Sequence, residues 1–101
     1  MPEFAHPFAG VALDRKVTHE ELIRAIRYNI AAEYEAIQLY MQLAESTDNE
    51  KAKAVLVDIA NEEREHAGEF LRLLKELDPE EEKYYQEGAE EVEEMLKKLQ
   101  K

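Results

Sequence analysis

The chain has 101 residues, no cysteine and a formal net charge of −11, from 24 Asp and Glu against 13 Lys and Arg. Without cysteine, disulfides, thiolate metal sites and thiol nucleophiles are excluded, and oxygen and nitrogen ligands are the only metal chemistry left. The negative charge disfavours binding to nucleic acid and to anionic lipid. No apolar run approaches the ~18 residues of a membrane span, and the chain does not open with the basic-then-apolar pattern of a secretory signal. We therefore expect a cytoplasmic protein.

Residues 1–17 contain His6-Pro7 and Gly10 and show no sustained hydrophobic period. They predict an irregular N-terminal arm, either extended or simply floppy. The remainder, residues 18–101, is long enough for one domain and no more.

Two long helices are predicted next. Residues 18–21, Thr-His-Glu-Glu, form a capping-box pattern that opens a helix running without Gly or Pro to about Ser46. A Ser-Thr-Asp-Asn turn leads into a second helix over residues 49–77, which an Asp-Pro pair ends. The short turn predicts an antiparallel hairpin.

Residues 79–98 are rich in Glu, carry apolar residues at roughly helical spacing and are interrupted by Gly88. They predict a shorter C-terminal helix, which either docks on a neighbouring chain or frays as a marginal surface helix. The expected fold is therefore all-α, a two-helix hairpin plus this helix. Since such a hairpin buries little by itself, we expect two chains to dimerise into a four-helix bundle.

Glu33, Glu63 and His66 are polar residues within two apolar stripes. On a wheel of about 100° per residue, Glu33 lies within roughly 60° of the apolar residues of its helix, and Glu63 at about 60° from His66. A buried carboxylate or imidazole is costly unless it is neutralised, which a metal ion does better than a hydrogen bond. The apolar members of the stripes are Leu22, Ile26, Ile30, Ile37, Tyr40 and Ala44 in the first helix and Val55, Ile59, Phe70, Leu73 and Leu77 in the second.

The spacing favours a shared metal site. Residues three apart lie on adjacent turns of one helix face, so Glu63 and His66 reach the same ion or two neighbouring ions, and Glu33 adds a carboxylate from the facing helix. Ferritin-like di-iron bundles use a Glu from two helices and Glu-x-x-His from the other two. One chain supplies half of that set, so a homodimer would complete a centre with two Fe ions per dimer; Mn or Zn would also fit the ligands.

Other residues near this trio are weaker candidates. Tyr40, two turns from Glu33, is either a catalytic residue that bonds a ligand carboxylate or donates an electron, or a core tyrosine. Glu62 and Glu69 flank His66 on the shoulder of the second helix, and Glu35 lies near the far side of the first. These three glutamates are candidates for a metal access route or for supporting the ligands.

Two segments carry a resemblance to a known family. Residues 29–40, Asn-Ile-Ala-Ala-Glu-Tyr-Glu-Ala-Ile-Gln-Leu-Tyr, and residues 58–67, Asp-Ile-Ala-Asn-Glu-Glu-Arg-Glu-His-Ala, resemble the rubrerythrin-type branch of the ferritin-like superfamily. A hairpin of this length most resembles the encapsulated ferritins, half-ferritins that act as ferroxidases inside encapsulin compartments. The chain departs from some members at Ala32 and Leu39, where an acidic residue and a Trp belong to an external metal site, although Glu35 matches an acidic position of that site.

This resemblance implies a specific activity. Glu33, Glu63 and His66 would hold two Fe²⁺ ions at a dimer interface, O₂ would oxidise them to Fe³⁺, and the product would feed iron storage. It further implies that dimers assemble into a ring, typically a decamer, with an encapsulin shell protein as partner and an encapsulin nanocompartment as location.

Two other function classes stay open. A rubrerythrin-like peroxide reductase would use the same metal pair, but with no cysteine it would need an external electron donor. A metal-free helical assembly module would use the polar trio to fix the register of its interface.

Overall fold

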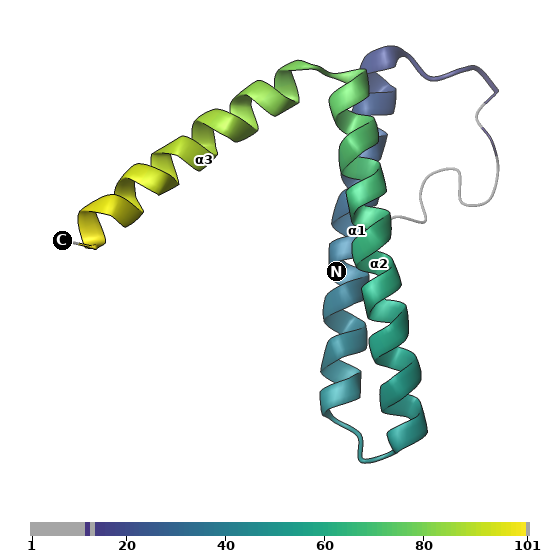
Figure 1. The fold of residues 1–101 in the computed structure, drawn as a ribbon. Helices are drawn as coiled ribbons and strands as arrows, with labels where there is room; N and C mark the ends of the chain where they lie inside the picture. The colour runs from purple at the N-terminus through teal and green to yellow at the C-terminus, as the bar shows by residue number, and fades with distance from the viewer. Residues whose placement is uncertain (1–11, 13, 101) are drawn as a thin grey trace.

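A computed structural model describes residue 12 and residues 14–100, which form three helices and no strand (Figure 1). They are α1 (His19–Glu45), α2 (Glu50–Leu77) and α3 (Glu80–Leu99). The first two lie antiparallel, side by side along their whole length, and α3 leaves one end of this hairpin. The predicted all-α hairpin with a shorter third helix is therefore confirmed, while most of the predicted irregular arm, residues 1–17, lies outside the described residues.

The ends of the helices follow from local side-chain chemistry. At the start of α1, the Glu21 amide donates to Thr18 Oγ1 at 3.1 Å and the Thr18 amide donates to Glu21 Oε1 at 2.8 Å, which is the predicted capping box. Two hydrogen bonds from Arg15 to the same carboxylate help to lower the pKa of Glu21 to about 2. Asn49 caps α2 by accepting from the Ala52 amide at 3.0 Å.

One detail of the third helix differs from the prediction. The sequence suggests an interruption at Gly88, yet α3 continues through it to Leu99. A mid-helix glycine costs only about 0.5–1 kcal/mol relative to alanine, and the flanking residues are mostly good helix formers such as Glu, Lys, Ala and Leu. The local preference of the neighbours therefore outweighs the single glycine.

A small core holds the hairpin together. Its larger buried members are Ile23, Ile26, Ile30 and Leu74, with Leu22, Phe70, Leu71 and Leu77 packed against them. Ala44, Ala60 and Ala67 are also buried, where small side chains let the two helices approach closely. The radius of gyration is 17.9 Å, against about 13 Å for a compact domain of this length. The chain alone is thus extended and leaves much apolar surface uncovered.

The buried stripe of α2 is displaced from the predicted one. Ala60, Ala67 and Leu74 face α1, whereas Val55 and Leu73, predicted to share a core face with His66, are exposed. A helical wheel shows which side of a helix is apolar. It does not show which part of that side packs against a neighbouring helix. Among the described residues, α1 is the only helix that lies beside α2 along the hairpin, so the rest of the stripe, including His66, remains outside the core. In the part of the chain that the structure describes, no helix is long and apolar enough to cross a membrane.

Candidate metal centre

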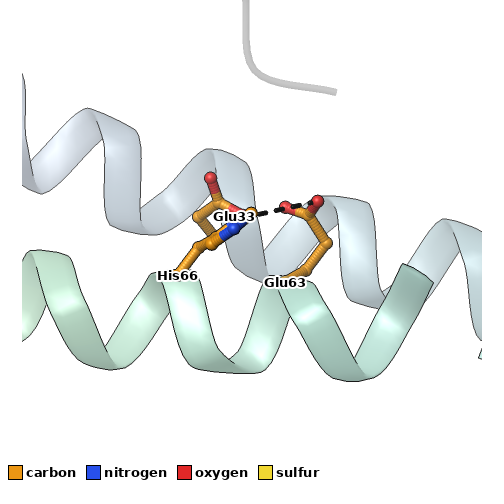
Figure 2. Close-up of side chains that lie close together, drawn as sticks. All are labelled: Glu33, Glu63 and His66. Carbon is orange, nitrogen blue, oxygen red and sulfur yellow. Dashed lines mark ion pairs between the residues drawn. The ribbon is translucent and has the colours of Figure 1, made fainter. Parts of the chain in front are cut away.

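The three predicted ligands come together near the middle of the hairpin. Glu33 extends from α1, and Glu63 and His66 extend from successive turns of α2, so that their polar ends converge between the two helices (Figure 2). One ligand atom from each residue lies within 4.8 Å of the other two. Among the described residues, this is the only group of three His, Cys, Asp or Glu side chains so arranged.

The distances within the group suit a shared cation better than mutual hydrogen bonds. His66 Nδ1 lies 3.7 Å from Glu33 Oε2 and 3.8 Å from Glu63 Oε1, which is beyond ordinary hydrogen-bond length. These contacts are ion pairs only if the imidazole is protonated. Two carboxylates and one imidazole are donors that iron, manganese and zinc all accept.

The three side chains of the group differ in how far they are buried. The side chains of Glu33 and Glu63 are 17% and 19% exposed, whereas that of His66 is 48% exposed. Glu33 Oε2 is buried and makes no hydrogen bond with any residue that the structure describes, which is unusual because buried polar atoms are nearly always paired. A cation bound at this oxygen would take the place of the missing hydrogen bond. The buried, unpaired oxygen of Glu33 therefore fits a role as a metal ligand.

The group opens on a cleft of about 290 Å³ lined by Glu33, His66, Glu69 and Phe70. The prediction that His66 is buried in the core is wrong for the single chain, because the imidazole stands at the edge of the hairpin interface. Phe70 is predicted from the sequence only as a core residue, but it forms a wall of this cleft. Its position one helical turn after His66 could have indicated that it lies next to the site. The centre therefore lies at the surface of one chain and is not enclosed by it.

The weaker candidates are not part of the ligand group. Glu69 reaches the cleft, but Glu62 is fully exposed, and the pKa of its carboxyl is raised mainly by a hydrogen bond with Asp58. Glu35 is partly buried and outside the group. Tyr40 is partly buried and makes no hydrogen bond with any described residue. Roles for these four residues remain predictions.

Comparisons with known proteins agree with the fold and with the resemblance. The family model described as rubrerythrin matches residues 24–101. A Myxococcus xanthus protein named encapsulin nanocompartment cargo protein EncC is 47% identical over 90 residues, which cover 89% of this chain and 68% of that protein. A Pyrococcus furiosus protein named ferritin-like-encapsulin shell fusion protein is 44% identical over 82 residues, which cover 81% of this chain and 24% of that protein.

A solved structure shows the same architecture. The crystal structure of the encapsulated ferritin domain from Pyrococcus furiosus matches with a TM-score of 0.80 and 43% sequence identity. The match covers 83% of this chain and 86% of the crystallised chain. The expected relation to encapsulated ferritins is thereby confirmed.

Proposed function

The chain belongs to the rubrerythrin family, as a ferritin-like protein of the encapsulated-ferritin type, and we propose that it is a ferroxidase that oxidises Fe²⁺ to Fe³⁺ with O₂. The observation that carries this proposal is the convergence of Glu33, Glu63 and His66. Iron is the substrate of this reaction, and the three side chains are its binding groups.

The proposed active form is a homodimer. Each chain offers two carboxylates and one imidazole, which is half of the ligand set that ferritin-like di-iron bundles use. The half-site opens at the surface, on the face of α2 that also carries the exposed apolar side chains of Val55 and Leu73. A second copy related by a two-fold axis would cover this apolar surface, form a four-helix bundle and bring the same three ligands to the site. Two Fe ions would then be bound per dimer.

The chemistry follows from the ligand types. Two carboxylates from each chain compensate much of the charge of the bound cations, and their negative charge favours Fe³⁺ over Fe²⁺, which promotes oxidation. The two ferrous ions supply one electron each, so a pair can reduce O₂ to hydrogen peroxide with uptake of two protons. His66 would bind a metal ion through an imidazole nitrogen. Tyr40, which lies two turns from Glu33, is a further candidate electron or hydrogen-bond donor.

The partner in this proposal is an encapsulin shell. Support comes from the relatives, because one is named as an encapsulin nanocompartment cargo protein and another as a fusion to an encapsulin shell. Dimers of this chain would assemble into a ring, with a decamer as the expected size, inside the compartment that retains the oxidised iron. Co-expression with the shell protein, followed by isolation of intact shells, tests this association by whether the chain remains inside them.

The direct test of the activity is iron oxidation by variant proteins. Anaerobic addition of Fe²⁺ followed by air should give rapid oxidation, seen as ferric absorbance, in the wild type. Glu63→Gln and His66→Ala should abolish the rate above that of free iron, because each removes a ligand from both halves of the centre. Glu65→Gln is the matched control, since this exposed neighbour lies outside the ligand group and should retain the wild-type rate. Equal rates in all four proteins would refute the proposal.

A peroxide reductase is the second candidate, favoured by the match to the rubrerythrin family over residues 24–101. It would bind metal through the same three residues but use peroxide as the oxidant and an external electron donor. Stopped-flow oxidation of the ferrous protein distinguishes the two functions. A faster reaction with O₂ supports a ferroxidase, and a markedly faster reaction with hydrogen peroxide supports the reductase.

A further inference from the structure

The direction of α3 is not set by the hydrophobic core. The helix contacts the hairpin only near its own start and then extends away from it (Figure 1). Among the described residues, α3 contributes no buried side chain, and it has no backbone contact with α1. A helix joined to a hairpin only through Asp78-Pro79 would be free to pivot unless other interactions held it.

Polar contacts supply such interactions at the base of the helix. Arg27 of α1 donates to Glu81 of α3, and the same guanidinium lies 3.6 Å from Asp78 Oδ2 in the linker. The hydroxyl of Tyr85, one turn further along α3, donates to the other oxygen of Glu81. We call Arg27, Asp78, Glu81 and Tyr85 the polar joint.

A second contact reaches the other helix of the hairpin. Lys75 Nζ of α2 lies 2.7 Å from Glu82 Oε2 of α3. Glu81 and Glu82 are neighbours in sequence and point about 100° apart on α3, one toward α1 and the other toward α2. A single tether would still allow rotation about its own axis, whereas two tethers in different directions restrain both the tilt of α3 and its rotation.

Arg27 is the stronger of the two anchors on physical grounds. Lys75 and Glu82 form a single ion pair with side chains 36% and 46% exposed, and partly exposed pairs of this kind contribute little. The Glu81 side chain is only 14% exposed and receives hydrogen bonds at both carboxylate oxygens, one of them charge-assisted. These bonds from Tyr85 and Arg27 lower the pKa of Glu81, so the carboxylate is ionised at neutral pH. The joint is therefore fully formed under ordinary conditions.

We propose that the polar joint makes α3 a rigid arm of fixed direction, and that Arg27 is its main positioning residue. The joint thereby determines where the exposed apolar side chains of α3, such as Val92 and Leu96, stand relative to the hairpin. Loss of Arg27 frees the arm to swing about the Asp78-Pro79 linker while the helices themselves stay folded. Because Arg27 is 46% exposed, high ionic strength weakens the joint and loosens the arm.

The test is a distance measurement between spin labels on the full chain. The native sequence has no cysteine, so Lys51→Cys and Lys98→Cys place labels only at the far end of the hairpin and near the tip of α3. Pulsed electron–electron double resonance is recorded without iron, because paramagnetic iron would perturb the spin labels. An excess of unlabelled chain is added, so that distances within one chain dominate. The labelled parent should give one narrow peak, which broadens at high salt.

The variants decide the role of Arg27. Arg27→Gln should replace the narrow peak by a broad distribution with unchanged helicity, and Arg24→Gln should leave the peak intact. Arg24 is the matched control because it lies nearly one turn earlier on α1, carries the same charge and has no ion pair with a described residue. If Arg27→Gln unfolds the chain, Glu81→Gln replaces it as the test. A peak that stays narrow in the folded variant, or an equal broadening in the Arg24 control, would overturn the proposal.

Discussion

Glu33 is predicted to reduce the stability of the metal-free protein, because two carboxylates share one site and the buried Oε2 of Glu33 makes no hydrogen bond with a described residue. Replacing Glu33 with methionine removes both costs while filling similar space. An unsatisfied buried polar group costs about 1–3 kcal/mol. Oε2 itself is buried, but the Glu33 side chain as a whole is 17% exposed, so water still reaches part of the side chain and reduces the cost. We therefore expect a gain near the lower end, about 1 kcal/mol, which corresponds to a rise in Tm of about 4–8 °C for a domain of this size.

The measurement is thermal unfolding by circular dichroism at fixed protein concentration, first with a chelator and then with excess Mn²⁺ in place of oxidisable iron. The metal should raise the Tm of the wild type, since a ligand that binds only the folded state stabilises it. It should have little effect on Glu33→Met. Glu65→Met is the control, because substitution of this exposed residue should stay within about 0.5 kcal/mol in either condition. A lower Tm for metal-free Glu33→Met than for wild type would refute the reasoning, since it would show that Glu33 stabilises the apo fold.

Three further predictions follow from other parts of the chain. Gly88→Ala should raise the helicity of α3 and stabilise it by about 0.5–1 kcal/mol, because a Cβ at this position meets no atom within 4 Å; a loss of helicity by circular dichroism would contradict this. The pKa of Glu21 is lowered to about 2 from 4.5, so its contribution to the start of α1 is present above about pH 4.5 and disappears as the pH falls toward 2. The protection factors of the Thr18 and Glu21 amides, which correct for the slower intrinsic exchange in acid, should fall over that range in the wild type, and those in Glu21→Gln should change less; identical pH profiles would count against it. Chelation near neutral pH should shift the protein toward monomer, because a dimer without metal brings four carboxylates together, and Fe²⁺ should restore the larger species. An elution volume in size-exclusion chromatography that stays the same with and without metal would exclude coupling between metal binding and dimerisation.

The helices and the convergence of Glu33, Glu63 and His66 could be predicted because both depend on local spacing. The capping box at Thr18, the Ser-Thr-Asp-Asn turn and the Asp78-Pro79 stop lie within a few residues of the boundaries they set. The convergence of Glu33 with Glu63 and His66 follows once the two helices pair as a short-looped hairpin. These features require only helix geometry and one antiparallel contact.

The exposure of His66 and the direction of α3 could not be predicted in the same way. A wheel shows that His66 shares a face with Val55 and Leu73, but which helix covers that face depends on packing between segments far apart in sequence. The polar joint likewise links Arg27 to Glu81, which are 54 positions apart, and neither residue stands out in an acidic helical sequence. Such contacts are set by tertiary geometry and leave no periodic signal.

Native mass spectrometry during an anaerobic Fe²⁺ titration tests the central claim most directly, because it reports the number of chains and of bound metals together. A ferroxidase centre shared between two chains should give species with even numbers of chains and two iron ions for each pair, and His66→Ala should bind none. Iron bound to isolated single chains would contradict the shared site. An assembly that binds no iron at any concentration would contradict the ferroxidase proposal.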